Sequence, residues 1–277
     1  LFRKHPLQLT ESDRNKMRAA GRFNAQLMDH IRPWVRPGVT TDEIEALVLE
    51  YTREFGHTPS QLGYRVGDAV FNHSCCTSVN DVICHGIPGD RKLKAGDAVN
   101  IDITVIKDGF HGDTSKMFFV GEPSILARRL VDITQRAMWK GIELVRPGCR
   151  LGDIGHAIQR YVESNGYSVV QEYCGHGIGR EFHEDPQVLH YGKPGTGVVL
   201  EEGAGAPGVL VVQRLEARRV DQGEVGEHLR RPAHVEVVDV VRGDALLPDA
   251  HVDFIKLDAE GHELAVLSGL AALIGRC

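Results

Sequence analysis

The residues with the clearest chemical potential are two aspartates, Asp102 and Asp113, in the run NIDITVIKDGFHGD over residues 100–113. Apolar and polar residues alternate through its first half, which is the period of a β-strand. The Asp-Gly pair in its middle is a strong signal for a two-residue hairpin turn. That turn places Thr104 opposite Asp113, with Asp102 as a diagonal neighbour on the same face. Two carboxylates this close repel each other, and one or two divalent cations would relieve the repulsion.

Three histidines in glycine- or proline-bearing segments favour the metal interpretation over a plain surface hairpin, in which aspartates beside a turn are also common. They are His85 in CHGIP, His176 in GHGIG and His183 in FHEDP. Neutral imidazole binds first-row transition metals, and neighbouring glycines leave a histidine open to close approach. A bulge at Gly112 would bend the second strand of the hairpin further.

The cysteines suggest a different site, which the spacing does not favour. A cysteine–histidine zinc site would draw on His73, Cys75, Cys76, Cys84 and His85. These residues fit no usual zinc-knuckle spacing. Six cysteines in 277 residues, two of them adjacent, also do not indicate a disulfide scaffold. A reducing cytoplasm is the compartment that this usage favours.

Composition narrows the function classes. The length of 277 residues suits one large or two modest domains. A net charge of −6 argues against a general nucleic-acid binder. We see neither an apolar run long enough to cross a membrane nor a signal peptide. We therefore expect a cytoplasmic protein that binds neither nucleic acid nor membranes.

The chain repeats itself once. The tetrapeptide Val-Arg-Pro-Gly at residues 35–38 recurs 110 residues later at 145–148. The same offset aligns three further pairs of identical residues: Ile44 with Ile154, Tyr51 with Tyr161 and Gly56 with Gly166. Apolar residues at helical spacing flank both copies, and Thr10 with Asp13 and Thr40 with Glu43 are placed to form capping boxes. Each unit therefore predicts a helix, a Pro-Gly break, a helix and then strands, with a site between the two units.

Three long strings resemble segments of the bacterial type I methionine aminopeptidases. The resemblance extends over residues 1 to about 203. The strings are VICHGIP at residues 82–88, NIDITVIKDGFHGDTSKMF at 100–118 and EYCGHGIGREFHEDPQVLHY at 172–191. The resemblance implies an α+β fold of the pita-bread type, in which helices back antiparallel strands in two pseudo-symmetric halves. It also implies metal-dependent removal of the N-terminal methionine from nascent proteins.

The resemblance also assigns metal ligands, position by position. Asp102 matches the bidentate carboxylate of the family's dimetal centre, Asp113 the bridging carboxylate and His176 the histidine ligand. It implies two divalent metal ions, and Co, Mn, Fe and Zn all remain open because such sites accept several metals. The implied partners are nascent polypeptide N-termini near the ribosome, met by a monomeric enzyme.

The same carry-over assigns the substrate site. His85 and His183 match the two histidines that contact substrate and steady the tetrahedral intermediate, so we take them as the catalytic pair. Tyr64 and Phe182 match residues beside the methionine pocket.

The pattern of the family stops after VVLEEG at residues 198–203. The family continues into a strand that carries a glutamate ligand, which also acts as the proton shuttle, and later supplies a second glutamate. The first position falls near Val209, where this chain has an apolar run without an acid. Glu216 and Glu236 are weak substitutes. We therefore expect an incomplete second half and impaired activity.

Residues 204–277 form a divergent tail. Residues 203–208 fit G-x-G-x-x-G, but no convincing helix follows, so we do not infer nucleotide binding. The run VDFIKLDAEGHE at 252–263 resembles the FkbM-type methyltransferases, and we expect a Rossmann-like fragment over about 233–277. The junction is either a genuine fusion with a degraded second half or a frameshifted or chimeric reading of two genes. We favour the latter because the break falls inside a domain.

Three functional hypotheses follow for the chain. The first is an impaired dimetal aminopeptidase. The second is a non-catalytic pita-bread protein that binds peptides or another partner, which the unmatched glutamates favour. The third, which only the last segment favours, is a fragment of an S-adenosylmethionine-dependent methyltransferase.

Overall fold

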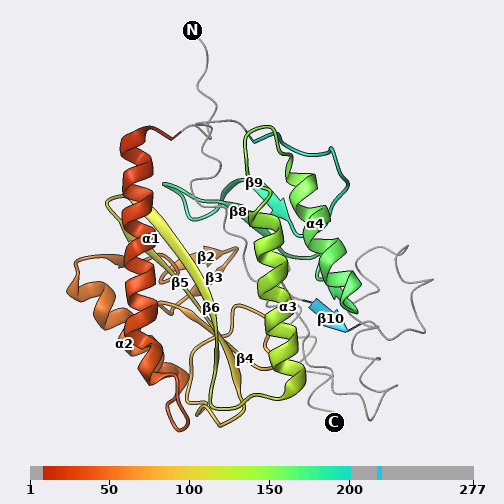
Figure 1. Cartoon of the computed structure of the whole chain (residues 1–277). Coiled ribbons are helices and arrows are strands. Elements are labelled where there is room, and N and C mark those ends of the chain that lie inside the picture. The colour runs from red at the N-terminus through yellow and green to blue at the C-terminus, as the bar shows by residue number, and fades with distance from the viewer. Residues whose placement is uncertain (1–8, 201–216, 220–277) are drawn as a thin grey trace.

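The computed structural model describes residues 9–200 and 217–219, which form two halves of helices packed on antiparallel strands (Figure 1). The elements of the first half are α1 (Glu11–Ile31), the 3₁₀ helix η1 (Arg32–Trp34), α2 (Thr41–Glu54), β1 (Thr58–Pro59), β2 (Tyr64–Val66), β3 (Ala69–Phe71), β4 (Cys76–Val79), β5 (Ala98–Lys107) and β6 (Phe110–Phe119). Those of the second half are α3 (Ile125–Ile142), α4 (Leu151–Ser164), β7 (Tyr167–Val169), β8 (Cys174–Gly177), β9 (Glu184–Leu189) and β10 (Ala217–Arg219). None of the helices described is long and apolar enough to cross a membrane.

The predicted hairpin is confirmed as β5 and β6, the longest strands of the described chain. They pair antiparallel without interruption from Ala98 opposite Phe119 to Lys107 opposite Phe110. Thr104 lies opposite Asp113, as predicted. Apolar side chains of β5 point into the core below α1 and α2. The polar face of the hairpin is therefore turned away from these helices, toward the second half.

The prediction of a bulge at Gly112 is wrong. Gly112 pairs regularly with Val105, so β6 carries no extra residue there. Glycine is required here for a different reason, namely packing, because a Cβ at this position would lie 2.6 Å from the backbone of Ala20 in α1. Only glycine lets the helix backbone come this close to the strand. The register shift occurs instead between Gly175 and Gly177, that is, at His176 in the β8–β9 pair.

The predicted helix starts are confirmed at α1 and α2. The Thr10 hydroxyl accepts the Asp13 N–H and the Asp13 carboxylate accepts the Thr10 N–H, which is the reciprocal capping box. Thr40 and Glu43 make the same pair of bonds at α2. Both boxes satisfy N–H groups that have no partner inside their helix.

The sequence repeat is also a structural repeat. After the first Pro-Gly break, Gly38 N donates to Leu93 O at 2.8 Å and Leu93 N donates to Val39 O at 2.8 Å. After the second break, Gly148 N donates to Leu200 O at 2.7 Å and Leu200 N donates to Cys149 O at 2.8 Å. Helices α2 and α4 begin and end at positions that keep the offset of the repeat. In both halves, a pair of backbone hydrogen bonds thus joins the segment after the Pro-Gly break to a residue later in the chain.

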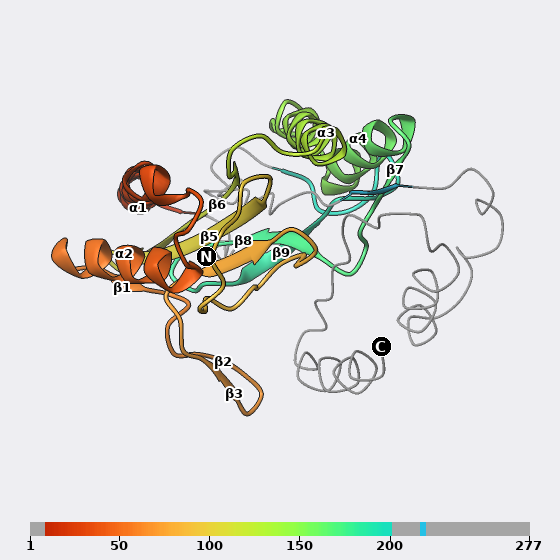
Figure 2. The same ribbon diagram turned by 90° about the horizontal axis from the view of Figure 1, so that it is seen from below.

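Each half has its own core. The first lies between α1, α2 and the β5 sheet, and the second lies between α3, α4 and strands β7 and β9. Viewed from below, β5, β6, β8 and β9 lie together in the middle, between the helices of the two halves, and the β2–β3 hairpin projects from the body (Figure 2). The sequence prediction of a site between the two units therefore points to these central strands.

Candidate metal centre

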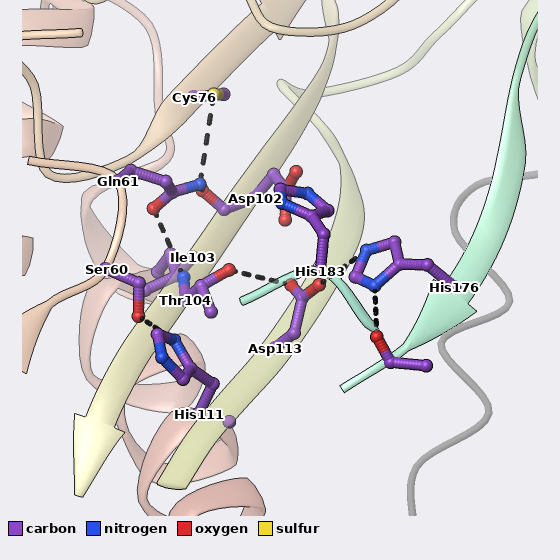
Figure 3. A network of polar contacts seen from close by, with 12 residues as sticks. Ser60, Gln61, Cys76, Asp102, Ile103, Thr104, His111, Asp113, His176 and His183 are labelled. Atoms are coloured by element: carbon purple, nitrogen blue, oxygen red, sulfur yellow. Dashed lines mark hydrogen bonds and ion pairs between the residues drawn. The ribbon is translucent and has the colours of Figure 1, made fainter. Parts of the chain in front are cut away.

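Asp113 is a buried acid of this central region. Its side chain is 2 % exposed, and the Thr104 hydroxyl donates to its Oδ1 at 3.0 Å. No donor in the described part of the chain makes a hydrogen bond to its Oδ2. The ring of His176 comes next, with Nε2 at 3.9 Å from that oxygen (Figure 3). A buried carboxylate oxygen facing an imidazole nitrogen is a combination suited to a cation.

Burial raises the pKa of Asp113 to about 6. The Thr104 hydroxyl, contact with the Asp102 carboxyl group and the Thr114 backbone each lower it, but they do not offset the loss of solvation. At neutral pH the carboxylate is therefore charged in an environment that opposes its charge. A bound cation would supply the missing compensation.

Asp102 joins Asp113 from the neighbouring strand. It lies opposite Ser115 in β6 and opposite Cys76 in β4, so it is the diagonal neighbour of Asp113 that the hairpin predicted. The close contact between the two carboxyl groups is visible in its effect on the pKa of Asp113. The sequence prediction that the two acids share one face of the hairpin is met.

His176 presents the nitrogen that a metal needs. Its Nδ1 lies 2.9 Å from the carbonyl oxygen of Gly177. A carbonyl can only accept, so Nδ1 carries a proton, and in the neutral ring the lone pair is then on Nε2, which faces Asp113. The register shift between Gly175 and Gly177 turns this residue out of the regular β8–β9 pairing. A Cβ at Gly177 would meet the Asp185 carbonyl, so glycine is required for the strands to approach here.

His183 lies beside His176, with ring centroids 4.5 Å apart. Burial, followed by the neighbouring rings of His176, His85 and His111, lowers the pKa of His183 to about 4. It is therefore neutral at physiological pH. The Tyr64 hydroxyl lies 2.8 Å from its Nδ1, so the orientation of the ring is held from the β2–β3 hairpin.

His85 belongs to the same cluster, since its charge lowers the pKa of His183. The segment that carries it is fixed against β4: Thr77 N donates to Gly86 O at 2.7 Å, and Gly86 N donates to the Ser78 hydroxyl at 3.1 Å. A side chain at position 86 would collide with the Thr77 backbone. The structure thus brings both histidines of the predicted catalytic pair to one place.

Phe182 forms an aromatic wall on this cluster. Its ring stacks on His183 with centroids 4.2 Å apart and lies 5.3 Å from the ring of Tyr64. On another side it stacks on His111 at 5.7 Å. The two residues predicted beside a methionine pocket therefore contact one another and the predicted catalytic histidine.

The sequence analysis did not identify three residues that surround the candidate site. They are His111, whose Nδ1 lies 2.8 Å from the Ser60 hydroxyl, Ser60 itself and Gln61, whose carboxamide bonds to the β5 backbone. The period of two along β6 places His111 on the same face as Asp113, and that signal was available. Ser60 and Gln61 carry no local pattern that marks them.

The residues fit part of a metal site. Within residues 9–200 and 217–219, no group of three His, Cys, Asp or Glu side chains is already spaced to hold a metal ion. Asp102, Asp113 and His176 nevertheless offer two carboxylates and an imidazole, a donor set that suits divalent first-row metals. The weak substitutes Glu216 and Glu236 lie outside the described residues.

The alternative zinc site is not formed in the described part of the chain. Burial raises the pKa of the Cys75 and Cys76 thiols well above the usual value, so both stay protonated. His73 instead directs its Nδ1 to Glu45 at 2.6 Å.

The chain has close relatives among the curated proteins. A methionine aminopeptidase of Salmonella typhimurium is 55 % identical over 196 residues, which are 70 % of this chain and 73 % of that relative. The methionine aminopeptidase of Rickettsia prowazekii is 52 % identical over 194 residues, with the same coverage. The chain thus spans about three quarters of the length of these relatives.

Solved structures agree with this relationship. The crystal structure of the Rickettsia prowazekii methionine aminopeptidase superposes with a TM-score of 0.68 at 52 % identity, covering 71 % of this chain and 77 % of that one. Prolidase from Pyrococcus furiosus superposes at 0.61 with 20 % identity, covering 71 % and 55 %, and shows the fold alone. The fold is therefore the pita-bread fold, as predicted.

Two families divide the chain between them. Residues 208–277 match the methyltransferase FkbM domain, so the resemblance seen near the C-terminus is confirmed, and the match begins before residue 233. The expected Rossmann-like fragment and the boundary at residues 203 and 204 lie outside the described residues and stay predictions. Residues 15–205 match metallopeptidase family M24. By this match and by its methionine aminopeptidase relatives, the chain belongs to metallopeptidase family M24.

Proposed function

We propose that this chain is a methionine aminopeptidase that removes the N-terminal methionine from nascent proteins with the help of divalent metal ions, and that its activity is impaired. The observation that carries the metal assignment is the buried Asp113 Oδ2, which faces His176 Nε2 at 3.9 Å while the other nitrogen of that histidine is committed to Gly177. Family membership and relatives named methionine aminopeptidase support the reaction.

In this proposal Asp102, Asp113 and His176 hold the metal, with Co, Mn, Fe and Zn as candidates. Bound divalent ions lower the pKa of a water molecule and polarise the scissile carbonyl. His183 is neutral and held at Nδ1 by Tyr64, which leaves its Nε2 to face the substrate. His85 supports it from the neighbouring segment, and the rings of Tyr64 and Phe182 contact the methionine side chain.

Impairment is proposed because the family's two glutamate ligands have no match in this sequence. In the family, the first of these glutamates is also the proton shuttle for the leaving amine. Its position falls near Val209 in this chain. A site without it loses charge compensation and a general acid–base at once. We propose nascent polypeptide N-termini near the ribosome as substrates of a monomeric, cytoplasmic protein, on the strength of the methionine aminopeptidase names of the relatives.

A titration with Mn²⁺ and a cleavage assay on a Met-initiated tripeptide, run on the full chain, test this. We expect one weakly bound ion, slow turnover, and loss of both in Asp113→Asn. Two tightly bound ions with full turnover would show that the chain is not impaired. The matched control is Asp108→Asn in the β5–β6 turn, which removes an exposed acid and leaves both readouts unchanged.

A non-catalytic peptide-binding protein is the second candidate, favoured by the two glutamate ligands of the family that have no match in this sequence. It predicts that the tripeptide binds while Mn²⁺ neither binds nor promotes cleavage. Binding of S-adenosylmethionine to the full chain would instead favour the methyltransferase hypothesis. The FkbM match covers only the last 70 residues, fewer than a Rossmann-like cofactor domain needs.

A further inference from the structure

The edge of β5 that carries Asp102 has two successive partners. β6 pairs along the whole length of β5 and occupies one edge. On the other edge β4 pairs with β5 from Val99 to Asp102, and β1 pairs with it at Val105 and Ile106. Between these partners lies a gap at Ile103 and Thr104, where no strand of the described chain pairs with this edge of β5.

The carboxamide of Gln61 fills this gap. Its Nε2 donates to the carbonyl oxygen of Asp102 at 3.1 Å, and its Oε1 accepts the N–H of Thr104 at 3.2 Å (Figure 3). Next to it, Ser60 N donates to Thr104 O at 2.8 Å and continues the ladder of β1. Since a carboxamide offers the same donor and acceptor as a peptide group, the side chain takes the place of one residue of a strand.

Gln61 is buried at this position, with only 5 % of the residue exposed. Its Nε2 also lies 3.9 Å from Cys76 Sγ, at the end of β4. Water therefore has little access to the two peptide groups that Gln61 satisfies, and each would lose its partner if the carboxamide were removed. Leaving buried peptide groups unsatisfied is costly, so the backbone would shift to find other partners.

Both peptide groups are connected to carboxylates of the proposed metal centre. The carbonyl that accepts from Gln61 is that of Asp102, whose side chain is a proposed metal ligand. The N–H that donates to Gln61 is that of Thr104, whose hydroxyl holds Asp113 Oδ1 at 3.0 Å. A shift of the β5 backbone here would move one carboxylate directly and the other through its hydrogen bond.

We propose that Gln61 is a positioning residue of the metal centre: its carboxamide bridges the gap between β4 and β1 and thereby sets the places of the Asp102 and Asp113 carboxylates. This inference rests on the proposed metal binding. Gln61 itself does not bind the ion. Its effect on the centre passes through the backbone of β5.

The test is Gln61→Met, which keeps the length of the side chain and removes both hydrogen bonds. Calorimetric titration of the full chain with Mn²⁺ should show an affinity about 10- to 100-fold lower, the usual effect of losing a group that orients metal ligands. Hydrogen exchange, measured without metal, should show the Thr104 amide losing protection relative to other amides of β5.

The matched control is Asn80→Ala. The Asn80 carboxamide also bonds to β5, where its Oδ1 accepts the Ala98 N–H at 2.9 Å, but at the end of the strand away from Asp102 and Asp113. We expect a comparable fall in melting temperature with unchanged Mn²⁺ affinity. This separates a positioning effect from a general loss of stability.

The outcomes are distinct. Weaker Mn²⁺ binding in Gln61→Met with faster Thr104 exchange, neither of them seen in Asn80→Ala, supports the inference. Faster exchange with unchanged affinity overturns it, and so does an equal loss of affinity in both variants. A wild-type chain that binds no Mn²⁺ at all overturns the proposed function together with this inference.

Discussion

Asp113 carries an electrostatic cost in the proposed metal centre, because burial opposes its charge. A carboxyl whose pKa in the fold, about 6, exceeds its ordinary value of 3.8 binds its proton more tightly when folded than when unfolded. The stability of the metal-free fold therefore falls as the pH rises through this interval. Well above pH 6 the penalty is complete, at most about 3 kcal/mol, since one pKa unit corresponds to about 1.4 kcal/mol.

Asp113→Asn should consequently raise the melting temperature of the metal-free protein at pH 8. The amide keeps an oxygen for the Thr104 hydroxyl and removes the buried charge. The gain should shrink toward zero below pH 4, where the wild-type carboxyl is also neutral. Thermal unfolding with chelator at several pH values measures this, and an equal gain at every pH would contradict the electrostatic cause.

His183 should change the pH dependence of stability in the opposite direction to Asp113. Its pKa in the fold, about 4, lies below the ordinary value of 6.5, so the unfolded chain takes up a proton first as the pH falls. The stability that the neutral ring contributes is present above pH 6.5 and is lost between pH 6.5 and 4. Replacing the ring by a group that does not titrate should remove this part of the acid sensitivity.

We therefore expect His183→Gln to lose less stability than the wild type between pH 7 and pH 4, in urea titrations without metal. The comparison between variants removes the contributions of other acids and histidines, which both proteins share. Parallel stability curves would show that this ring does not titrate as described.

At the scale of elements, the contact between α1 and β6 requires glycine. Gly112→Ala should destabilise the fold by about 1–3 kcal/mol, because the added methyl group meets the Ala20 backbone rather than a flexible side chain. The metal centre should weaken with it, since Asp113 is the next residue. Chemical denaturation and a Mn²⁺ titration measure the two effects.

Gly21→Ala is the matched control on the facing helix. Nothing lies within 4 Å of a Cβ there, so alanine should stabilise α1 by about 0.5–1 kcal/mol through its higher helix propensity. A Gly112→Ala protein as stable as the wild type would mean that α1 and β6 adjust easily to one another.

Sequence patterns predicted the elements whose signals are local. The hairpin follows from the alternation and the Asp-Gly turn, the helix starts from Thr10 with Asp13 and Thr40 with Glu43, and the two halves from the repeated Val-Arg-Pro-Gly. These features depend on residues a few positions apart, or on identity between the copies.

Features that depend on distant segments were not predicted. Gly112 resembled a bulge, although it serves the packing of a helix some ninety residues earlier in the chain. Gln61 carries no pattern, because its role arises only where β1 and β4 meet on β5. The family resemblance supplied His176 as a ligand, but the register shift that turns it toward Asp113 came from the structure.

At the scale of the whole molecule, the proposed donors Asp102, Asp113 and His176 belong to the part that matches the relatives, and the two glutamates that we propose to be missing would belong to the part that does not. Joining residues 1–203 to the remainder of the Escherichia coli methionine aminopeptidase, of which this chain matches 73 % at 54 % identity, should therefore restore a complete centre. Turnover of a Met-initiated tripeptide should rise at least about 100-fold, since losing even an outer-shell partner of a metal costs about 10–100-fold.

Val209→Glu in the present chain is the control for this experiment. A single acid without its surrounding strand should give no measurable gain in turnover. Full activity from that substitution would mean that the tail already provides the missing half of the centre.

The carboxamide of Asn24 holds the hairpin from the side of α1. Buried in that helix, it donates both to the Ile103 carbonyl of β5 and to the Gly112 carbonyl of β6. The peptides next to Asp102 and Asp113 are thus cross-linked before any ion arrives. An incoming cation would therefore meet two strands whose backbones are already fixed to each other, and the adjustment that binding requires would fall on the side chains of the acids.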